Sequence, residues 1–276
     1  MAKSSTITLE VCVDSVDSAI NALKGGADRL EICANLGVGG GTTPSLGLVK
    51  CIENVCDELG KDADLVVMIR PRIGDFVYSA NEVLAMKADI EEFAGCRRVK
   101  GVVFGALTPT GTVDVEVTRS LASLSGDRGL QVCFHRAFDM LEDQEQALRD
   151  LSCVPGITRI LTSGGSPQAP SAITVLKNLC VLRSTLTTDS FRMQLMPGSG
   201  LNASTLPDIL RVLLPLGVRD VHLSGGAWRS GRAQFQKENM GMGAGGKHDW
   251  DVWTTAEEKV HAARAICDSL WEENCG

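Results

Sequence analysis

Short apolar segments rich in β-branched residues recur along the whole chain and alternate with longer segments of helical periodicity. The eight apolar segments cover residues 7–13, 29–33, 65–70, 101–107, 131–137, 159–162, 192–196 and 220–223. Near-continuous apolar character is typical of strands covered on both faces, as in a parallel sheet beneath helices. Repeated strand–helix units favour right-handed crossovers, and eight of them close a sheet into a barrel. The sequence therefore predicts a (β/α)8 TIM-like barrel, with a doubly wound open sheet as the alternative.

Helical signals lie between the predicted strands. The first intervening segment places its apolar residues three and four positions apart: Val16, Ala19, Ile20 and Leu23. The patterns Ser79-Ala-Asn-Glu82 and Thr255-Ala-Glu-Glu258 are capping boxes, which predict helix starts. A length of 276 residues fits one barrel, so we expect a single domain over residues 1–276. Residues 224–253 are rich in glycine and predict a long loop after the last strand, either a lid, a binding segment or a disordered stretch.

Acidic residues outnumber basic ones by 34 to 27, which gives a formal net charge of −7. This balance disfavours nonspecific binding of nucleic acid. The first residues lack the apolar centre of a signal peptide, and no run approaches the roughly 18 apolar residues of a membrane span. We therefore expect a cytosolic protein without membrane association, whose ten cysteines are reduced.

The first two predicted strands carry the same Glu-x-Cys pattern. Because side chains alternate along a strand, Glu10 and Cys12 share a face, as do Glu31 and Cys33. In neighbouring parallel strands of similar register, Cys12 lies near Cys33 and the two glutamates are neighbours. Facing thiolates, with Met68 close by, are soft donors that suit Cu(I). The alternative is that both cysteines pack as small hydrophobic core residues.

Charged and imidazole side chains follow at the ends of the third and fifth predicted strands. These residues are Arg70, Arg72, His135, Arg136 and Asp139. The arginines can offer N–H donors to Glu10 and Glu31 or to an anionic ligand. Barrel active sites lie at the carboxyl ends of strands, so these two glutamates with Arg70, His135, Arg136 and Asp139 form a candidate catalytic set. A buried ion-pair layer is the alternative. His222, near the end of the eighth strand, fits a hydrogen-bonded core residue or a functional one.

Glycines follow the seventh and eighth predicted strands. The residues concerned are Gly198, Ser199, Gly200, Ser224, Gly225 and Gly226. In barrels of this kind the loops after strands seven and eight often bind phosphate, because glycine leaves backbone N–H groups accessible to oxygen atoms. The pattern predicts a phosphate or anion site, with ligand-free tight turns as the alternative.

Several ordered motifs together resemble the CutC copper homeostasis family. They are Leu9-Glu10-Val11-Cys12-Val13-Asp14-Ser15, Gly25-Gly26-Ala27-Asp28-Arg29-Leu30-Glu31-Ile32-Cys33, Gly40-Gly41-Thr42-Thr43-Pro44-Ser45, Met68-Ile69-Arg70-Pro71-Arg72 and Phe134-His135-Arg136-Ala137-Phe138-Asp139. The resemblance extends from about residue 7 to at least residue 196, and residues 227–253 depart from it most. It implies a TIM-like barrel, a cytoplasmic or cytoplasmic and nuclear location, a role in copper tolerance or trafficking, and Cu(I) ligands at Cys12 and Cys33.

Two functions account for different parts of this site. A copper homeostasis protein would use Cys12 and Cys33, with Glu10, Glu31 and His135 around the ion. An isomerase, lyase or hydrolase acting on a small phosphorylated metabolite would instead use the charged residues and the glycine loops. No lysine stands at an evident strand end, which disfavours Schiff-base chemistry. A third hypothesis is a scaffold that assembles through its outer helices, and the resemblance also favours a homo-oligomer.

Overall fold

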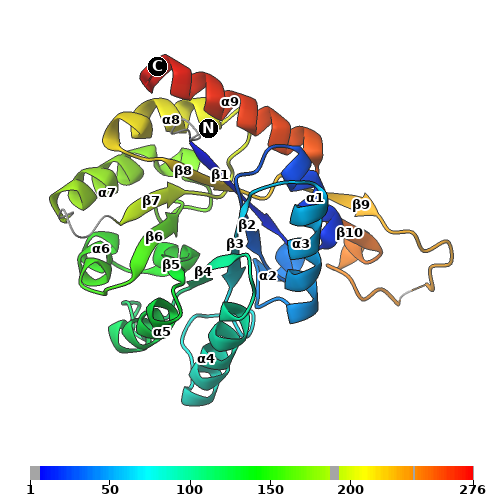
Figure 1. Ribbon diagram of the computed structural model, residues 1–276, viewed down its shortest axis with the longest axis horizontal. Coiled ribbons are helices and arrows are strands. Elements are labelled where there is room, and N and C mark those ends of the chain that lie inside the picture. Colours follow the sequence, from blue (N-terminus) through cyan, green and yellow to red (C-terminus); the bar gives the residue numbers. More distant parts are fainter. Residues whose placement is uncertain (1–6, 187–192, 239, 276) are drawn as a thin grey trace.

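A parallel barrel occupies the centre of the molecule, and helices surround it (Figure 1). The structure, a computed structural model, describes residues 7–186, 193–238 and 240–275. Eight parallel strands are hydrogen-bonded in the order β7-β6-β5-β4-β3-β2-β1-β8, and a parallel bridge between Gly198 and His222 joins β7 to β8. The (β/α)8 prediction is confirmed, because this bridge joins the two edges that an open sheet would leave apart.

Strands and helices alternate as the periodicity predicts. The barrel strands are β1 (Thr8–Val13), β2 (Arg29–Ile32), β3 (Asp64–Met68), β4 (Val99–Phe104), β5 (Gln131–Phe134), β6 (Ile157–Thr162), β7 (Gln194–Pro197) and β8 (Asp220–Leu223). The helices are α1 (Val16–Lys24), α2 (Leu36–Gly39), α3 (Leu46–Glu58), α4 (Ala80–Ala94), α5 (Val115–Asp127), α6 (Gln144–Ser152), α7 (Ile173–Leu186), α8 (Leu206–Leu213) and α9 (Glu257–Cys275). The predicted start of the seventh strand, residue 192, lies outside the described residues. No helix in the described ranges is long and apolar enough to cross a membrane.

One of the two predicted capping boxes is present. The Ser79 side chain accepts a hydrogen bond from the Glu82 backbone, and the Glu82 carboxylate accepts one from the Ser79 backbone, which fixes the start of α4. The prediction at Thr255 is wrong. Thr255 is the last residue of β10 (Asp251–Thr255), and its hydroxyl donates to the Ser224 carbonyl at 3.1 Å. Its side chain therefore ties β10 to the end of the barrel instead of capping α9.

The glycine-rich segment after β8 is a long hairpin, so the prediction of a loop over residues 224–253 is wrong at both ends. Antiparallel β9 (Gly226–Ser230) and β10 project from the barrel (Figure 1). Trp228 lies against Trp253 with ring centroids 5.3 Å apart, and it stacks on His248 at 4.7 Å. Cross-strand aromatic contacts of this kind stabilise a hairpin even where glycine is frequent.

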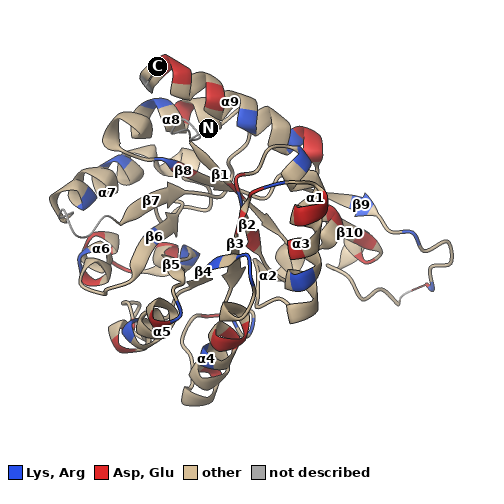
Figure 2. Cartoon of the chain, in the orientation of Figure 1, with Lys and Arg blue, Asp and Glu red and all other residues tan. Residues whose placement is uncertain are grey.

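Two buried clusters fill the fold, one between the strands and helices and one inside the barrel. The inner cluster comprises Cys12, Cys33, Val66, Met68, Val103, Cys133, Leu161 and Met196. Inward and outward residues alternate along each strand, so the large outer cluster holds the apolar residues between them. Lysine, arginine and acidic residues lie mainly along the outer helices (Figure 2). The charged residues inside the barrel are therefore an exception that requires specific partners.

Candidate metal centre and cavity

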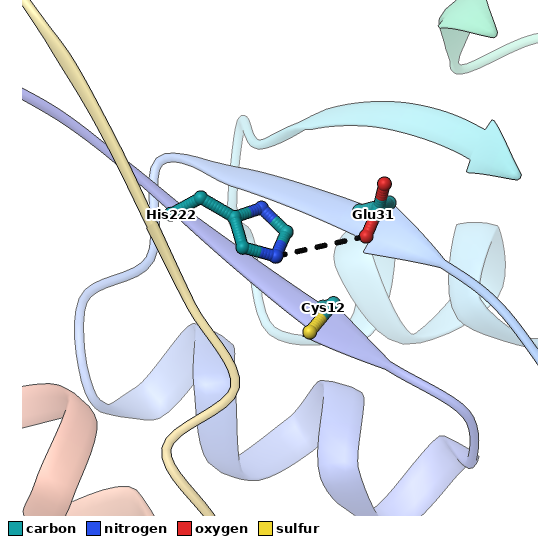
Figure 3. Close-up of side chains that lie close together, drawn as sticks. All are labelled: Cys12, Glu31 and His222. Atoms are coloured by element: carbon teal, nitrogen blue, oxygen red, sulfur yellow. Dashed lines mark ion pairs between the residues drawn. The ribbon is translucent and has the colours of Figure 1, made fainter. Parts of the chain in front are cut away.

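Three side chains from adjacent strands converge inside the mouth of the barrel. Cys12 of β1, Glu31 of β2 and His222 of β8 are buried, and their donor atoms all lie within 4.8 Å of one another. Figure 3 shows the His222 imidazole directed toward the Glu31 carboxylate, with Cys12 beside them on the neighbouring strand. A thiolate, an imidazole nitrogen and a carboxylate oxygen are common metal ligands in proteins. We call Cys12, Glu31 and His222 the triad.

The register of β1 and β2 differs from the expected one. Cys12 pairs with Glu31, and Glu10 pairs with Arg29, so the two Glu-x-Cys segments are offset by one inward-facing position. Strands in a closed barrel are staggered, and this stagger brings the carboxylate of Glu31, in place of the second thiol, beside Cys12. Cys33 lies further along, where its thiol contacts the Glu31 carboxylate at 3.6 Å and remains in the inner cluster with Cys12.

A buried ion-pair network supports the triad from below. The Glu10 carboxylate lies 2.7 Å from His222 Nδ1 and also pairs with Arg29, whose second contact is Asp220 at 2.6 Å. Glu10 is a hydrogen-bond acceptor, so His222 donates through Nδ1. This leaves Nε2, 3.8 Å from the Glu31 carboxylate, as the nitrogen that can ligate. A carboxylate that orients a ligating histidine in this way is a common feature of metal sites.

The pKa values of the two buried glutamates are shifted in opposite directions. Burial alone would raise the pKa of Glu10, but the Arg29 guanidinium and the hydrogen bond with His222 hold that pKa well below its usual range. Burial raises the pKa of Glu31 to about 7. The positive charge of His222 lowers this pKa, and the negative charge of Glu10 raises it. Glu31 is therefore a buried carboxyl that changes its charge near neutral pH.

The thiols of the inner cluster are protonated unless a metal displaces the proton. Burial raises the pKa of Cys12, although His222 opposes the shift, and burial together with Glu31 raises the pKa of Cys33 further. Because a thiolate is the ligating form, metal binding to these residues releases protons. A nucleophilic or readily oxidised cysteine is favoured by a lowered pKa, so the raised pKa values of Cys12 and Cys33 disfavour such a role.

The triad lines a cavity of about 460 Å³ that is formed by the carboxyl ends of the strands and the following loops. Of the predicted site residues, the lining includes Cys12, Glu31, Arg70, His135, Arg136, Ser199, Gly200, Ser224, Gly225 and Gly226. Glu10 and Cys33 are buried deeper in the barrel, below the cavity. Gly198 packs against Leu161 and His222, and Asp139 lines a second, separate pocket. Most of the residues predicted from strand ends and glycine loops are therefore brought together.

Arg70 does not pair with the glutamates, contrary to one of the two roles expected for it. Its guanidinium donates to the carbonyls of Gly39, Gly41 and Gly74 at 2.7, 3.0 and 2.9 Å. It also lies 4.7 Å from the centre of the Phe76 ring. The arginine thus holds the loops after β2 and β3 together while it lines the cavity.

His135 and Arg136 begin the short helix η1 (Arg136–Met140) after β5. His135 Nδ1 accepts from the Ala137 backbone at 3.2 Å, and burial with nearby Arg70 lowers the pKa of His135 to about 3. The imidazole is therefore neutral, with its proton on Nε2. Arg136 pairs with Asp139 at 2.8 Å.

Asp139 organises the loop after β6. Its carboxylate accepts from the Thr162 hydroxyl at 2.6 Å and from the backbones of Ser163 and Gly165. These contacts account for Asp139 as a structural residue that also orients Arg136.

The glycine loops after β7 and β8 line the cavity, and two of their glycines adopt a left-handed backbone conformation. Gly200 and Gly225 adopt φ values of 71° and 56°, which favour glycine, so tight turns explain these two residues. Ser199 shares the left-handed conformation at 71°, and its hydroxyl donates to the Pro167 carbonyl. A ligand role for these loops therefore depends on the cavity that they line.

Sequence reasoning does not predict Arg29, Trp253 or Lys259 as site residues, and it leaves His222 open between a core and a functional role. Alternation along the eighth strand places His222 on the same face as Asp220, a signal that could have found it. Lys259 lies in the first turn of α9, far from the end of any predicted strand, and reaches the cavity because the hairpin returns the chain there.

Comparison with known proteins identifies relatives over most of the chain. The model of the CutC family matches residues 7–227. The copper homeostasis protein cutC homolog of Mus musculus is 39% identical over 263 residues, covering 95% of this chain and 90% of that protein. The corresponding Homo sapiens protein is 38% identical, covering 95% and 89%. A crystal structure of a CutC protein from Streptococcus agalactiae superimposes with a TM-score of 0.68 at 31% identity, covering 79% of this chain and 98% of that one.

Proposed function

The chain belongs to the CutC family, and from this premise we propose that it is a cytosolic copper homeostasis protein that binds Cu(I) at the triad and contributes to copper tolerance or trafficking. The observation that carries the proposal is the convergence of Cys12, Glu31 and His222 on one point. A thiolate and an imidazole form a soft donor pair that suits Cu(I), and Glu31 lies beside them. Cys33 and Met68 add further sulfur atoms to the same inner cluster.

The two cysteines have different places in this proposal. Cys12 lines the cavity and is accessible to an ion that enters through the mouth. Cys33 is fully buried behind Glu31 and would reach the ion as a second thiolate after its proton is released. Cys12 is therefore the principal ligand, and Cys33 increases the affinity.

We expect tight Cu(I) binding in a competition titration against a chromophoric Cu(I) chelator under anaerobic conditions. Cys12→Ser should weaken the affinity at least tenfold, because the only thiol of the triad is lost, and Cys33→Ser should weaken it less. Cys180→Ser provides the matched control, because Cys180 is a buried thiol on α7 that belongs to the outer cluster and lines neither the triad nor the cavity. Wild-type affinity in Cys12→Ser would refute the copper site.

A second candidate function is an isomerase or lyase acting on a small phosphorylated metabolite. The favouring observation is that the loops after β7 and β8 line the same cavity as Glu31 and His135. Glu31, with its pKa of about 7, is suited to proton transfer at neutral pH, and neutral His135 is suited to donate to a substrate oxygen. Arg70 and Arg136 would stabilise negative charge that develops in the transition state.

Turnover by this candidate enzyme is tested directly by phosphorus NMR. Wild-type protein should convert at least one member of a panel of phosphorylated sugars and sugar acids, and Glu31→Gln should abolish the conversion because an amide cannot act as a general acid or base near neutral pH. Absence of conversion across the panel, in metal-free and copper-loaded protein alike, argues against the enzyme and leaves the copper role intact.

A further inference from the structure

The ionisable residues that line the cavity carry an excess of positive charge. Arg70, Arg136 and Lys259 face a single carboxyl group, Glu31, whereas the chain as a whole has a net charge of −7. Arg136 is compensated by Asp139. The other two cations have no carboxylate partner among the described residues.

Arg70 is the stronger of these two features because it is buried. Arg70 is only 7% exposed, and its guanidinium donates to neutral carbonyls. Its Nε atom is buried without a hydrogen-bond partner in the described part of the chain. A buried charge is costly unless an opposite charge or full hydrogen bonding compensates it. An anion in the cavity would supply that compensation.

His135 adds a second donor on the same side. Its proton lies on Nε2, because Nδ1 accepts from Ala137, and Nε2 is also without a partner among the described residues. The His135 and Phe76 rings are 5.0 Å apart, and Phe76 in turn lies against Arg70. The wall after β3 and β5 therefore carries two buried donor atoms, Arg70 Nε and His135 Nε2, that have no acceptor in the described part of the chain.

Lys259 stands on the opposite side of the triad. Its ammonium group donates to the Gly226 carbonyl at 2.9 Å, next to the loop after β8. The strand order β3-β2-β1-β8 places Glu31 on β2 and Cys12 on β1 between the end of β3, which precedes Arg70, and β8, which carries His222. A molecule that reaches both cations therefore passes over the metal ligands.

We propose that the cavity binds a small organic molecule with an oxyanion at each end, one held by Arg70 and His135 and the other by Lys259 and the loops after β7 and β8, across the metal held by the triad. The inference rests on the proposed copper site, because the ternary complex requires a metal there. The volume of about 460 Å³ lies within the usual range for small-molecule sites. The chemistry shared by carboxylate and phosphate ends is recognition by guanidinium, ammonium and N–H donors.

Isothermal titration of metal-free and Cu(I)-loaded protein tests this proposal. The probes are 2-phosphoglycolate and succinate, which have two anionic ends, and inorganic phosphate and glycolate, which have one. We expect at least one two-ended probe to bind at least tenfold more tightly than either one-ended probe. A preference for 2-phosphoglycolate over succinate would indicate a phosphate at one end, and the reverse preference would indicate a carboxylate at both ends. Equal affinity for one-ended and two-ended probes would overturn the proposal.

Charge-removing variants locate the two ends. Lys259→Met should weaken binding of the better two-ended probe about tenfold while leaving glycolate binding unchanged, and Lys50→Met on the exposed face of α3 is the matched control. Arg70→Met should have at least as large an effect, with circular dichroism checking the fold because Arg70 also holds loop carbonyls. Wild-type binding in Lys259→Met would refute the assignment.

The copper titration keeps the two proposals apart. Tight Cu(I) binding that is strengthened or unchanged by the two-ended probe supports the ternary complex, whereas competition between probe and Cu(I) overturns it. Failure of Cu(I) to bind, with the probe still bound in metal-free protein, refutes the ternary complex and the copper site but leaves the anion cavity.

Discussion

Replacing Arg29 with methionine is expected to destabilise the protein by about 3–5 kcal/mol, the cost of removing one partner from a buried ion pair. The guanidinium lies between Glu10 and Asp220, and all three residues are buried. Methionine fills similar space but leaves two carboxylates inside the barrel without their cation. The free energy of unfolding, measured in urea at pH 7, gives the size of the loss.

The pH dependence identifies Glu10 as the cause. The pKa of Glu10 is held below its usual value of 4.5, so its contribution to stability is present above that pH and is lost as the pH falls toward the folded-state pKa. The difference between wild type and Arg29→Met should therefore narrow below about pH 4.5. Arg97→Met, which breaks an exposed pair with Asp57, should cost far less stability than Arg29→Met because solvent screens exposed charges. A similar loss in both variants would contradict a special role for the buried network.

The architecture could be predicted from the sequence because it depends on periodicity. Strands covered on both faces read as continuous apolar runs, and the intervening helices each show one apolar stripe, so the count of eight followed directly. The capping box at Ser79 is equally local, since its two hydrogen bonds lie within four residues. The failure at Thr255 has a tertiary cause, because pairing with β9 extends the chain through that residue.

The site could be predicted only in part, because its geometry depends on register. Two identical Glu-x-Cys segments suggest that like residues face each other, but the stagger of a closed barrel places Cys12 beside Glu31. No local pattern encodes that offset. Lys259 is still harder to predict, because it enters the cavity from a helix that the hairpin positions. The loops after β7 and β8, by contrast, follow from strand order alone.

The buried carboxyl of Glu31 is expected to reduce the stability of the fold at and above neutral pH, and Glu31→Gln measures this effect. The pKa of Glu31 is raised to about 7 in the folded protein, above its usual 4.5. The contribution of this group to the free energy of unfolding is therefore fully present below pH 4.5 and is lost as the pH rises through 7. Glutamine stays neutral, so the variant should be more stable than wild type by about 3 kcal/mol at pH 8.5. Near pH 4.5 the two proteins should have nearly equal free energies of unfolding.

Urea unfolding at the two pH values, with Glu92→Gln on the exposed face of α4 as the control, separates this effect from a general change of charge. The same substitution should weaken Cu(I) binding, because one of the three converging ligands is replaced by a weaker donor. Oε1 of this carboxyl has no partner among the described residues, so stabilisation of Glu31→Gln at pH 8.5 alone is the result expected if Glu31 serves a ligand and not the fold. A variant that is less stable than wild type at pH 8.5, or equally stabilised at both pH values, would contradict that conclusion.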